Sequence, residues 1–134
     1  MPITIVIDVA NRVVITKCVG NLTFAEMREA AHGLARDPQF RPEFSQLVDL
    51  NQVSKLSLSF AEISTFKQSF DPFSEVARRA VAAPNNVTYG VGRMYESLTN
   101  SANFSVFRTI EEARKWLGLS ELSAESGPVN RGSQ

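Results

Sequence analysis

The stretch Leu47–Glu62, LVDLNQVSKLSLSFAE, decides how the chain is expected to fold. Its opening LVDL is an apolar run typical of a strand buried in a sheet, so we predict a strand over residues 45–50. Residues 51–58, most of them polar, are predicted to be a connection. Ser59 and Glu62 then match a capping box, in which serine and glutamate satisfy free amides at a helix start. The stretch therefore predicts a strand, a hydroxyl-rich bend and a helix.

Upstream, two β-branched runs predict an antiparallel hairpin. Residues 3–9 alternate as a strand does, Ala10-Asn11 interrupts the pattern, and residues 12–19 resume it. The segment 20–22 is expected to end the second strand. Thr23 and Glu26 form another capping box, which opens a helix to about Arg36.

Downstream, the second helix is predicted to end at about Phe70 or Phe73, and four more elements are predicted after it. A strand over 77–83, a helix over 87–98, a strand over 103–108 and a last helix stopped by Gly118 follow. After the hairpin each strand precedes a helix, and right-handed crossovers join parallel strands. The sequence predicts an α/β fold with an N-terminal β-hairpin followed by β-α repeats, about five strands in a mostly parallel sheet and four helices. Residues 1–119 are expected to be one domain and 120–134 a flexible tail.

Composition excludes several classes of function. Fourteen basic residues balance fourteen acidic ones, so no bulk charge draws the chain to nucleic acid or to an anionic membrane. No apolar run approaches the roughly 18 residues of a transmembrane helix. The single cysteine, Cys18, excludes an internal disulfide and is expected to be a buried small hydrophobe. The N-terminus reads as a strand and not as a signal peptide, so we expect a cytoplasmic protein.

The sequence carries no catalytic or metal-binding motif. HExxH, CxxC and Asp-rich loops are absent, and His32 is expected at the surface, with no second ligand at metal-binding spacing. We therefore predict a non-enzymatic protein without a metal or cofactor. One alternative is a pair of carboxylates, Asp8 and Asp49, at the ends of neighbouring strands, where Asp49 could serve an enzyme in acid-base chemistry.

Aromatic residues are concentrated on the second helix and its surroundings. Its predicted inner face consists of Phe60, Ile63, Phe66, Phe70 and Phe73. Core packing, an exposed apolar groove and a self-association face are three interpretations of this stripe. Together with Phe40, Phe44, Tyr89, Met94 and Tyr95, the stripe motivates the hypothesis of a small apolar ligand between this helix and the sheet.

The third helix is predicted to bury one apolar face and to contain two glycines. The residues expected on its inner face are Val87, Val91, Met94, Tyr95 and Leu98. Gly90 and Gly92 lower its helix propensity, and we expect them to permit close packing on the sheet.

The start of the second helix is the other candidate site. Sites in open α/β sheets form beyond the carboxyl ends of strands, and a helix N-terminus offers free amides and partial positive charge. Asp49, Ser57 and Ser59 are the polar residues predicted there. The favoured interpretation of these residues is that Ser59 only caps the helix, and a site for a protein partner is the alternative.

Many short segments resemble SpoIIAA-like proteins, whose fold is that of STAS domains and bacterial anti-sigma-factor antagonists. VDLNQVSKLSLSFAEI is similar to their central segment, in which a strand ends in Asp-Leu and a serine opens the next helix. GNLTFAE, DPQFRPEF, RRAVAA, YGVGRMYE and VFRTIEEARKWLG extend the resemblance over residues 3–117. It implies a SpoIIAA-like fold and a regulatory module that binds a protein partner or a second copy of itself.

The resemblance also gives Ser59 an implied role. In the antagonists a partner kinase phosphorylates the serine at this helix start and so switches binding. The antagonists read Asp-Ser-Ser-Gly there, whereas this chain reads Ser57-Leu58-Ser59-Phe60. A carrier or sensor of a small apolar ligand is the alternative function.

Overall fold

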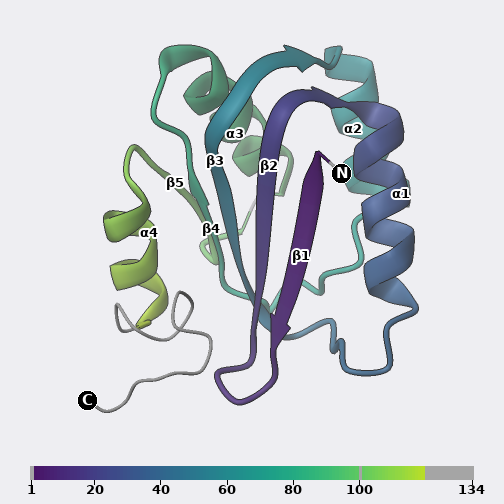
Figure 1. Ribbon diagram of the computed structural model, residues 1–134, viewed down its shortest axis with the longest axis vertical. Coiled ribbons are helices and arrows are strands. Elements are labelled where there is room, and N and C mark those ends of the chain that lie inside the picture. The colour runs from purple at the N-terminus through teal and green to yellow at the C-terminus, as the bar shows by residue number, and fades with distance from the viewer. Residues whose placement is uncertain (1, 100, 120–134) are drawn as a thin grey trace.

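The computed structural model describes residues 2–99 and 101–119. The expected tail, 120–134, lies outside the described residues. Within the described ranges five strands and four helices follow one another: β1 Ile3–Asp8, β2 Val13–Thr23, α1 Phe24–Ala35, β3 Ser45–Ser57, α2 Phe60–Ser69, β4 Arg79–Ala82, α3 Asn86–Thr99, β5 Phe104–Phe107 and α4 Ile110–Leu117 (Figure 1).

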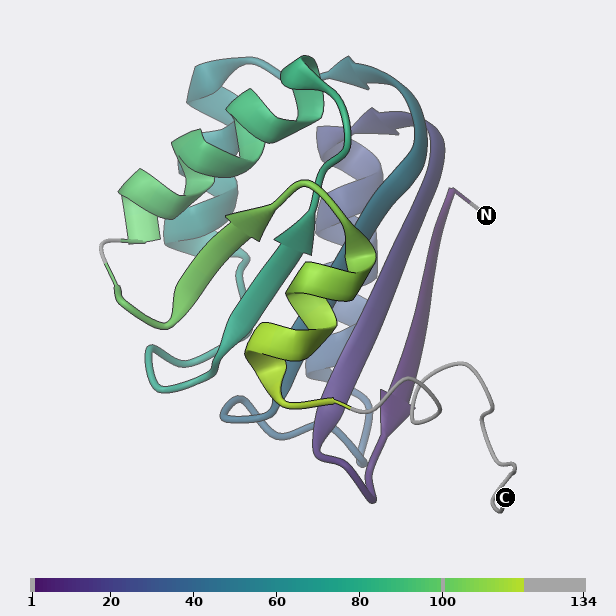
Figure 2. The same cartoon turned by 90° about the vertical axis from the view of Figure 1, so that its left-hand side faces the viewer.

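The strands form one mixed sheet in the order β1-β2-β3-β4-β5. β1 and β2 pair antiparallel as a hairpin, and the three remaining pairings are parallel. Helices α1, α2 and α3 lie on one face of the sheet and α4 lies on the other (Figure 2). The predicted α/β fold, with its hairpin, its mostly parallel sheet and its four helices, is confirmed.

The predicted end of β2 and the predicted bend after β3 are both wrong. β2 continues to Thr23 and β3 continues to Ser57, so residues 20–22 and 51–57 are strand. The two extensions pair with each other through Leu22 opposite Leu56, after register shifts near Gly20, whose φ is +77°. Mutual pairing satisfies backbone groups that neither segment would satisfy by itself. Only two residues, Leu58 and Ser59, separate β3 from α2.

Local helix signals are confirmed where the sequence placed them. The hydroxyls of Thr23 and Ser59 each accept from the amide three residues on, and the reciprocal glutamate bonds are present at both capping boxes. Gly118 ends α4 with a φ of +77°, a conformation that glycine adopts without a steric penalty.

The inner faces of α2 and α3 differ from the prediction at Phe60, Phe73 and Val87. Because α2 ends at Ser69, Phe73 lies in the loop that follows it. On α2, Ile63 and Phe66 are buried, whereas Phe60 is 59% exposed. At 100° per residue, Phe60 lies about 90° from the centre of the buried arc. Val87 is 66% exposed for the same reason, because the buried arc of α3 contains Thr88, Gly92 and Tyr95.

The expected close packing holds for Gly92 and not for Gly90. A Cβ at Gly92 would lie 2.9 Å from Val106 Cγ1, whereas a Cβ at Gly90 meets nothing within 4 Å.

The two faces of the sheet carry different cores. Alternation along β4 directs Ala80 and Ala82 toward α4, where they pack with Leu47 and Ala113. Arg79 and Val81 point the other way, toward the layer of α1, α2 and α3. The larger apolar cluster lies in that layer.

Candidate functional site

A mostly apolar cavity of about 150 Å³ lies between the sheet and helices α1, α2 and α3. β2 and β3 form its floor, and α1 and α2 form much of its wall. Apolar side chains dominate its lining; they include Cys18, Met27, Val48, Leu50, Ile63 and Phe66. A hollow of this size could hold a single ring or a short chain.

The cavity exists because α2 does not rest on the middle of the sheet. The principal contacts of α2 are with its neighbours α1 and α3. Val48 lies on the central strand and faces this layer, yet it is only half-buried, whereas the adjacent Leu47 on the opposite face is 1% exposed. The flanking helices thus support α2 and leave room above Val48.

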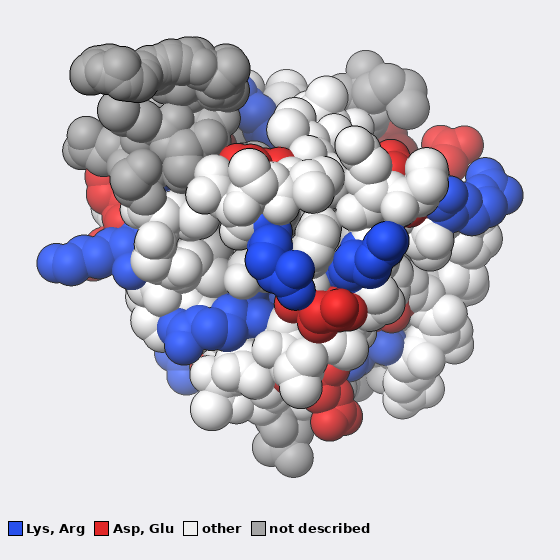
Figure 3. Space-filling model, turned by 90° about the horizontal axis from the view of Figure 1, so that it is seen from below, with Lys and Arg blue, Asp and Glu red and all other residues white. Residues whose placement is uncertain are grey.

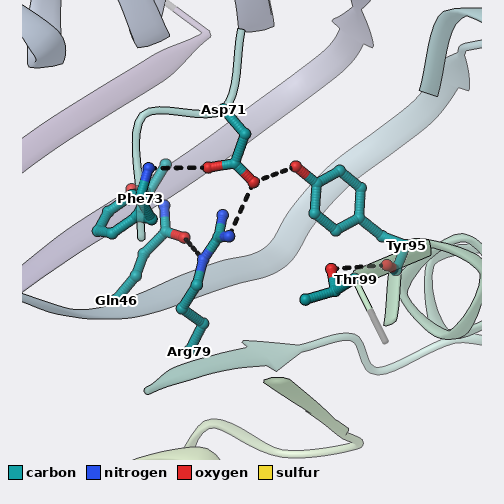
Figure 4. A network of polar contacts seen from close by, with 7 residues as sticks. Gln46, Asp71, Phe73, Arg79, Tyr95 and Thr99 are labelled. Carbon is teal, nitrogen blue, oxygen red and sulfur yellow. Dashed lines mark hydrogen bonds and ion pairs between the residues drawn. The ribbon is translucent and has the colours of Figure 1, made fainter. Parts of the chain in front are cut away.

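A buried ion pair closes the polar end of the cavity. Arg79 Nη1 lies 2.7 Å from Asp71 Oδ2, with the two side chains 9% and 1% exposed. Arg79 Nε donates to Gln46 Oε1 at 3.1 Å. All three residues line the cavity, and Figure 4 shows their arrangement. A buried pair that is also hydrogen-bonded keeps a strong local dipole at an otherwise apolar wall.

Tyr95 joins this cluster from α3. Its hydroxyl donates to Asp71 Oδ2 at 2.5 Å, and the amide of Phe73 donates to Asp71 Oδ1 at 3.1 Å. Burial, followed by the adjacent Asp71 carboxylate, raises the pKa of Tyr95 above its ordinary value. The hydroxyl therefore stays protonated at neutral pH and remains a donor.

Aromatic rings enclose the guanidinium of Arg79. The centroids of Phe73 and Phe104 lie 4.6 Å and 5.3 Å from its central carbon. On the β2 side, Thr16 Oγ1 accepts from Gln46 Nε2 at 3.1 Å. The cluster thus connects three strands to the loop after α2.

The apolar candidates from the sequence fall into separate environments. Ile63, Phe66 and Tyr95 line the cavity. Phe60 is exposed, and Phe70 makes edge contacts with Phe24 and His32. The remaining aromatic and sulfur-containing residues lie elsewhere: Phe40 and Phe44 in a second core cluster, Tyr89 beneath the Arg108 guanidinium, and Met94 partly buried against the main core.

The polar candidates near helix two are not brought together as one site. Ser59 Oγ accepts from the Glu62 amide at 3.1 Å, and Ser57 Oγ donates to Asn21 Oδ1 at 2.8 Å. Asp49 is not at a strand end, because β3 runs on to Ser57. Eight residues of strand span about 26 Å, so Asp49 belongs to another part of the sheet.

The alternative of a carboxylate pair, Asp8 with Asp49, is also wrong. β2 lies between β1 and β3, and Asp8 aligns with Val13, whereas Asp49 aligns with Lys17. Each carboxylate instead accepts from a nearby asparagine, Asp8 from Asn11 and Asp49 from Asn51. Both are short-range bonds between residues two or three positions apart, of the kind that aspartate side chains form with nearby groups.

Cys18 lies in the cavity wall, 4% exposed, as the sequence predicted for a small buried hydrophobe. Burial, then the charges of Asp49 and Glu26, raises the pKa of the thiol to about 12. The thiol is therefore protonated and poorly nucleophilic at neutral pH.

Sequence reasoning missed the cluster of Gln46, Asp71 and Arg79. These residues are 8 to 33 positions apart, so no local spacing joins them. One signal was present, because the alternation of RAVA places Arg79 on the same face as the apolar Val81.

Two features of the described residues concern binding to membranes and to charged partners. Over residues 2–99 and 101–119, no helix is long and apolar enough to cross a membrane. On the face shown in Figure 3, basic side chains are interspersed with acidic ones, in keeping with the balanced composition.

No family model and no curated protein matches the sequence. Among solved structures, the chain is similar to an uncharacterised protein of the DUF3478 family with a SpoIIAA-like fold, from Shewanella loihica PV-4. The TM-score is 0.57 at 21% identity, and the alignment covers 86% of this chain and 91% of that one. The SpoIIAA-like fold that the sequence resemblance implied is therefore shown.

Proposed function

We propose that this protein is a non-enzymatic binding module that carries or senses a small apolar ligand between α2 and the sheet. The cavity above Val48 supports this proposal. Apolar cavities of about 150 Å³ in proteins accept molecules of the size of benzene. Because typical drug-sized pockets occupy about 300–1,000 Å³, the ligand is a single ring or a short chain.

Toluene titration tests this function with the protein as it is. Toluene should shift the methyl resonances of Val48, Leu50 and Ile63 and raise the midpoint of thermal unfolding, because a ligand that binds only the folded state stabilises it. Resonances of the α4 face, such as those of Leu47, should move less. Unchanged cavity resonances at saturating toluene would refute the proposal.

A filled cavity provides the matched variant. Val48→Phe places a ring where the ligand would lie and should abolish the toluene shifts while the circular dichroism spectrum is retained. Val6→Phe is the control, because Val6 lies on β1 outside the cavity and is 57% exposed. Retained binding by Val48→Phe would show that toluene binds elsewhere.

The second candidate is a protein-partner surface at the start of α2, and the exposure of Phe60 beside Ser59 favours it. An aromatic ring that is 59% exposed next to a surface hydroxyl offers an anchor for a partner. Phosphorylation of Ser59 would add roughly −1.5 to −2 charge at this point. A second copy of the chain is the other occupant of the same surface.

Affinity capture from the native host tests this surface. Phe60→Ala should lose a captured protein that the wild type retains, and Ser59→Asp should change its recovery. Recovery of the same background by all three baits would exclude the surface. Light scattering of wild type and Phe60→Ala distinguishes self-association from binding of another protein. A dimer formed through this ring would be seen in the wild type and would become a monomer in Phe60→Ala.

A further inference from the structure

The acceptor groups at the polar end of the cavity are engaged by protein donors. Asp71 accepts from Arg79, Tyr95 and the Phe73 amide. Gln46 Oε1 accepts from Arg79 Nε, and this bond fixes the orientation of the amide because guanidinium nitrogens only donate. The acceptor capacity of the cluster is therefore largely used within the protein.

Donor capacity is left over in the same place. Thr16 Oγ1 accepts from Gln46, and among residues 2–99 and 101–119 its own hydrogen has no protein acceptor. The Gln46 amide uses one of its two N–H groups, and the Arg79 guanidinium uses two of its five. All three side chains are buried and line the cavity. The surplus at this end consists of donors.

The charge balance restricts which acceptor fits. Arg79 and Asp71 neutralise each other across 2.7 Å. A ligand carboxylate would leave one net negative charge inside apolar walls, which is strongly disfavoured. An uncharged carbonyl oxygen satisfies the surplus donors without that penalty.

We propose that the ligand is a small uncharged compound, apolar except for one carbonyl-type acceptor that faces Thr16, Gln46 and Arg79. This assignment rests on the proposed cavity function and names its ligand class. The apolar part lies over Val48, and the acceptor directs the molecule toward the loop after α2. Recognition thus combines the hydrophobic effect with hydrogen bonds that fix orientation.

Three probes of matched shape test the assignment: acetophenone, α-methylstyrene and benzoate. α-Methylstyrene replaces the carbonyl oxygen of acetophenone by a methylene, and benzoate replaces the methyl ketone by a carboxylate. Affinities from NMR titration are compared in wild type and in Thr16→Val, an almost isosteric change that removes the donor. Thr4→Val is the control, because Thr4 is exposed on β1 outside the cavity.

In Thr16→Val, the affinity ratio of acetophenone to α-methylstyrene should fall about 3- to 10-fold, the worth of one hydrogen bond. The ratio should stay unchanged in Thr4→Val and recover in Thr16→Ser. Wild type should bind benzoate at least about 10-fold more weakly than acetophenone, because the charge is not compensated. Should Thr16→Val fail to fold, Thr16→Ala replaces it with the same expected fall.

Each other outcome overturns a definite part of the proposal. Equal binding of acetophenone and α-methylstyrene by wild type would reject the carbonyl acceptor. A ratio that Thr16→Val does not change would reject Thr16 as its donor, because this variant frees the Gln46 N–H that the hydroxyl accepted from. Both outcomes leave the cavity function standing. Benzoate binding as tightly as acetophenone would reject the uncharged class. Failure of every probe, toluene included, to shift cavity resonances would reject the cavity function itself.

Discussion

The two faces of one sheet are packed in opposite ways. Toward α4, Ala80, Ala82 and Ala113 are completely buried and bring helix and strands close together. Toward α1, α2 and α3, β4 presents Arg79 and Val81 to a layer that contains the cavity. Four residues of one strand, RAVA, thus contribute to a close-packed side and a hollow side.

The difference separates a close-packed layer of the molecule from a layer that contains a cavity. Small side chains allow the close approach on the α4 face, and interiors packed in this way transmit strain and resist deformation. On the other face α2 is supported by its neighbouring helices, so Val48 of the central strand is left partly uncovered. A site on rigid strands can hold its donors in place.

The largest effect is expected from the ion pair of the hollow face. Asp71→Asn keeps the shape of the side chain but leaves the buried Arg79 charge unpaired, so we expect a loss of about 3–5 kcal/mol in the free energy of unfolding. Urea denaturation measures it. Glu96→Gln is the control, since its pair with Arg93 is largely exposed and should contribute no more than about 1 kcal/mol. A loss from Asp71→Asn no greater than that from Glu96→Gln would contradict the account.

The packing contrast is tested by adding atoms on each face. Ala80→Val inserts two methyl groups between β4 and α4 and should destabilise by about 1–3 kcal/mol, because that face has no room. Val48→Ile adds one methylene toward the cavity and should be neutral or stabilise by up to about 0.8 kcal/mol. The denaturant midpoints of the two variants measure these changes. Equal losses in the free energy of unfolding would mean that the two faces are packed alike.

The protonated thiol of the hollow face predicts a pH effect of intermediate size. The pKa of Cys18 is about 12 in the folded chain and near its ordinary value of 9.0 when unfolded, so between these values only the unfolded state loses the proton. Stability should therefore fall as pH rises above 9, by about 1.4 kcal/mol for each unit. Denaturation at pH 8, 9 and 10 should show the slope in wild type, and a parallel slope in Cys18→Val would contradict it.

The smallest effect is expected at the start of α2, which belongs to neither core, and it serves as a reference for the variants above. Ser59→Ala removes the cap of α2 and should cost about 1 kcal/mol in the free energy of unfolding. Toluene affinity should be retained within about twofold, because Ser59 does not line the cavity. A loss of toluene binding in a folded Ser59→Ala protein would mean that the start of α2 and the cavity form one site.

Much of the fold could be predicted because its signals are local. The capping boxes at Thr23 and Ser59 lie within four residues, and the hairpin follows from alternation on either side of one turn. The extension of β3 left no such signal. Its buried and half-buried residues there, Val53 and Leu56, are three apart, and its conformation depends on pairing with a distant segment of β2.

The candidate site could be predicted only in part. Ile63, Phe66 and Tyr95 were anticipated from helical periodicity, which identifies the side of a helix that faces the core. The cluster of Asp71 and Arg79 could not be, because an ion pair between a loop and a strand depends on tertiary arrangement. The same limit misplaced Asp49, whose predicted position depended on a strand end that pairing moved to Ser57.

The two-residue connection between β3 and α2 has a mechanical consequence. Because Leu58 and Ser59 are the whole link, the first turn of α2 has almost no slack relative to the end of β3. A bound ligand that displaces α2 from Val48 would rotate the helix about this short connection. The end of α2 near Phe70 would then move farther than its beginning. Paramagnetic labels at the two ends of α2 would therefore report different displacements when a ligand occupies the cavity.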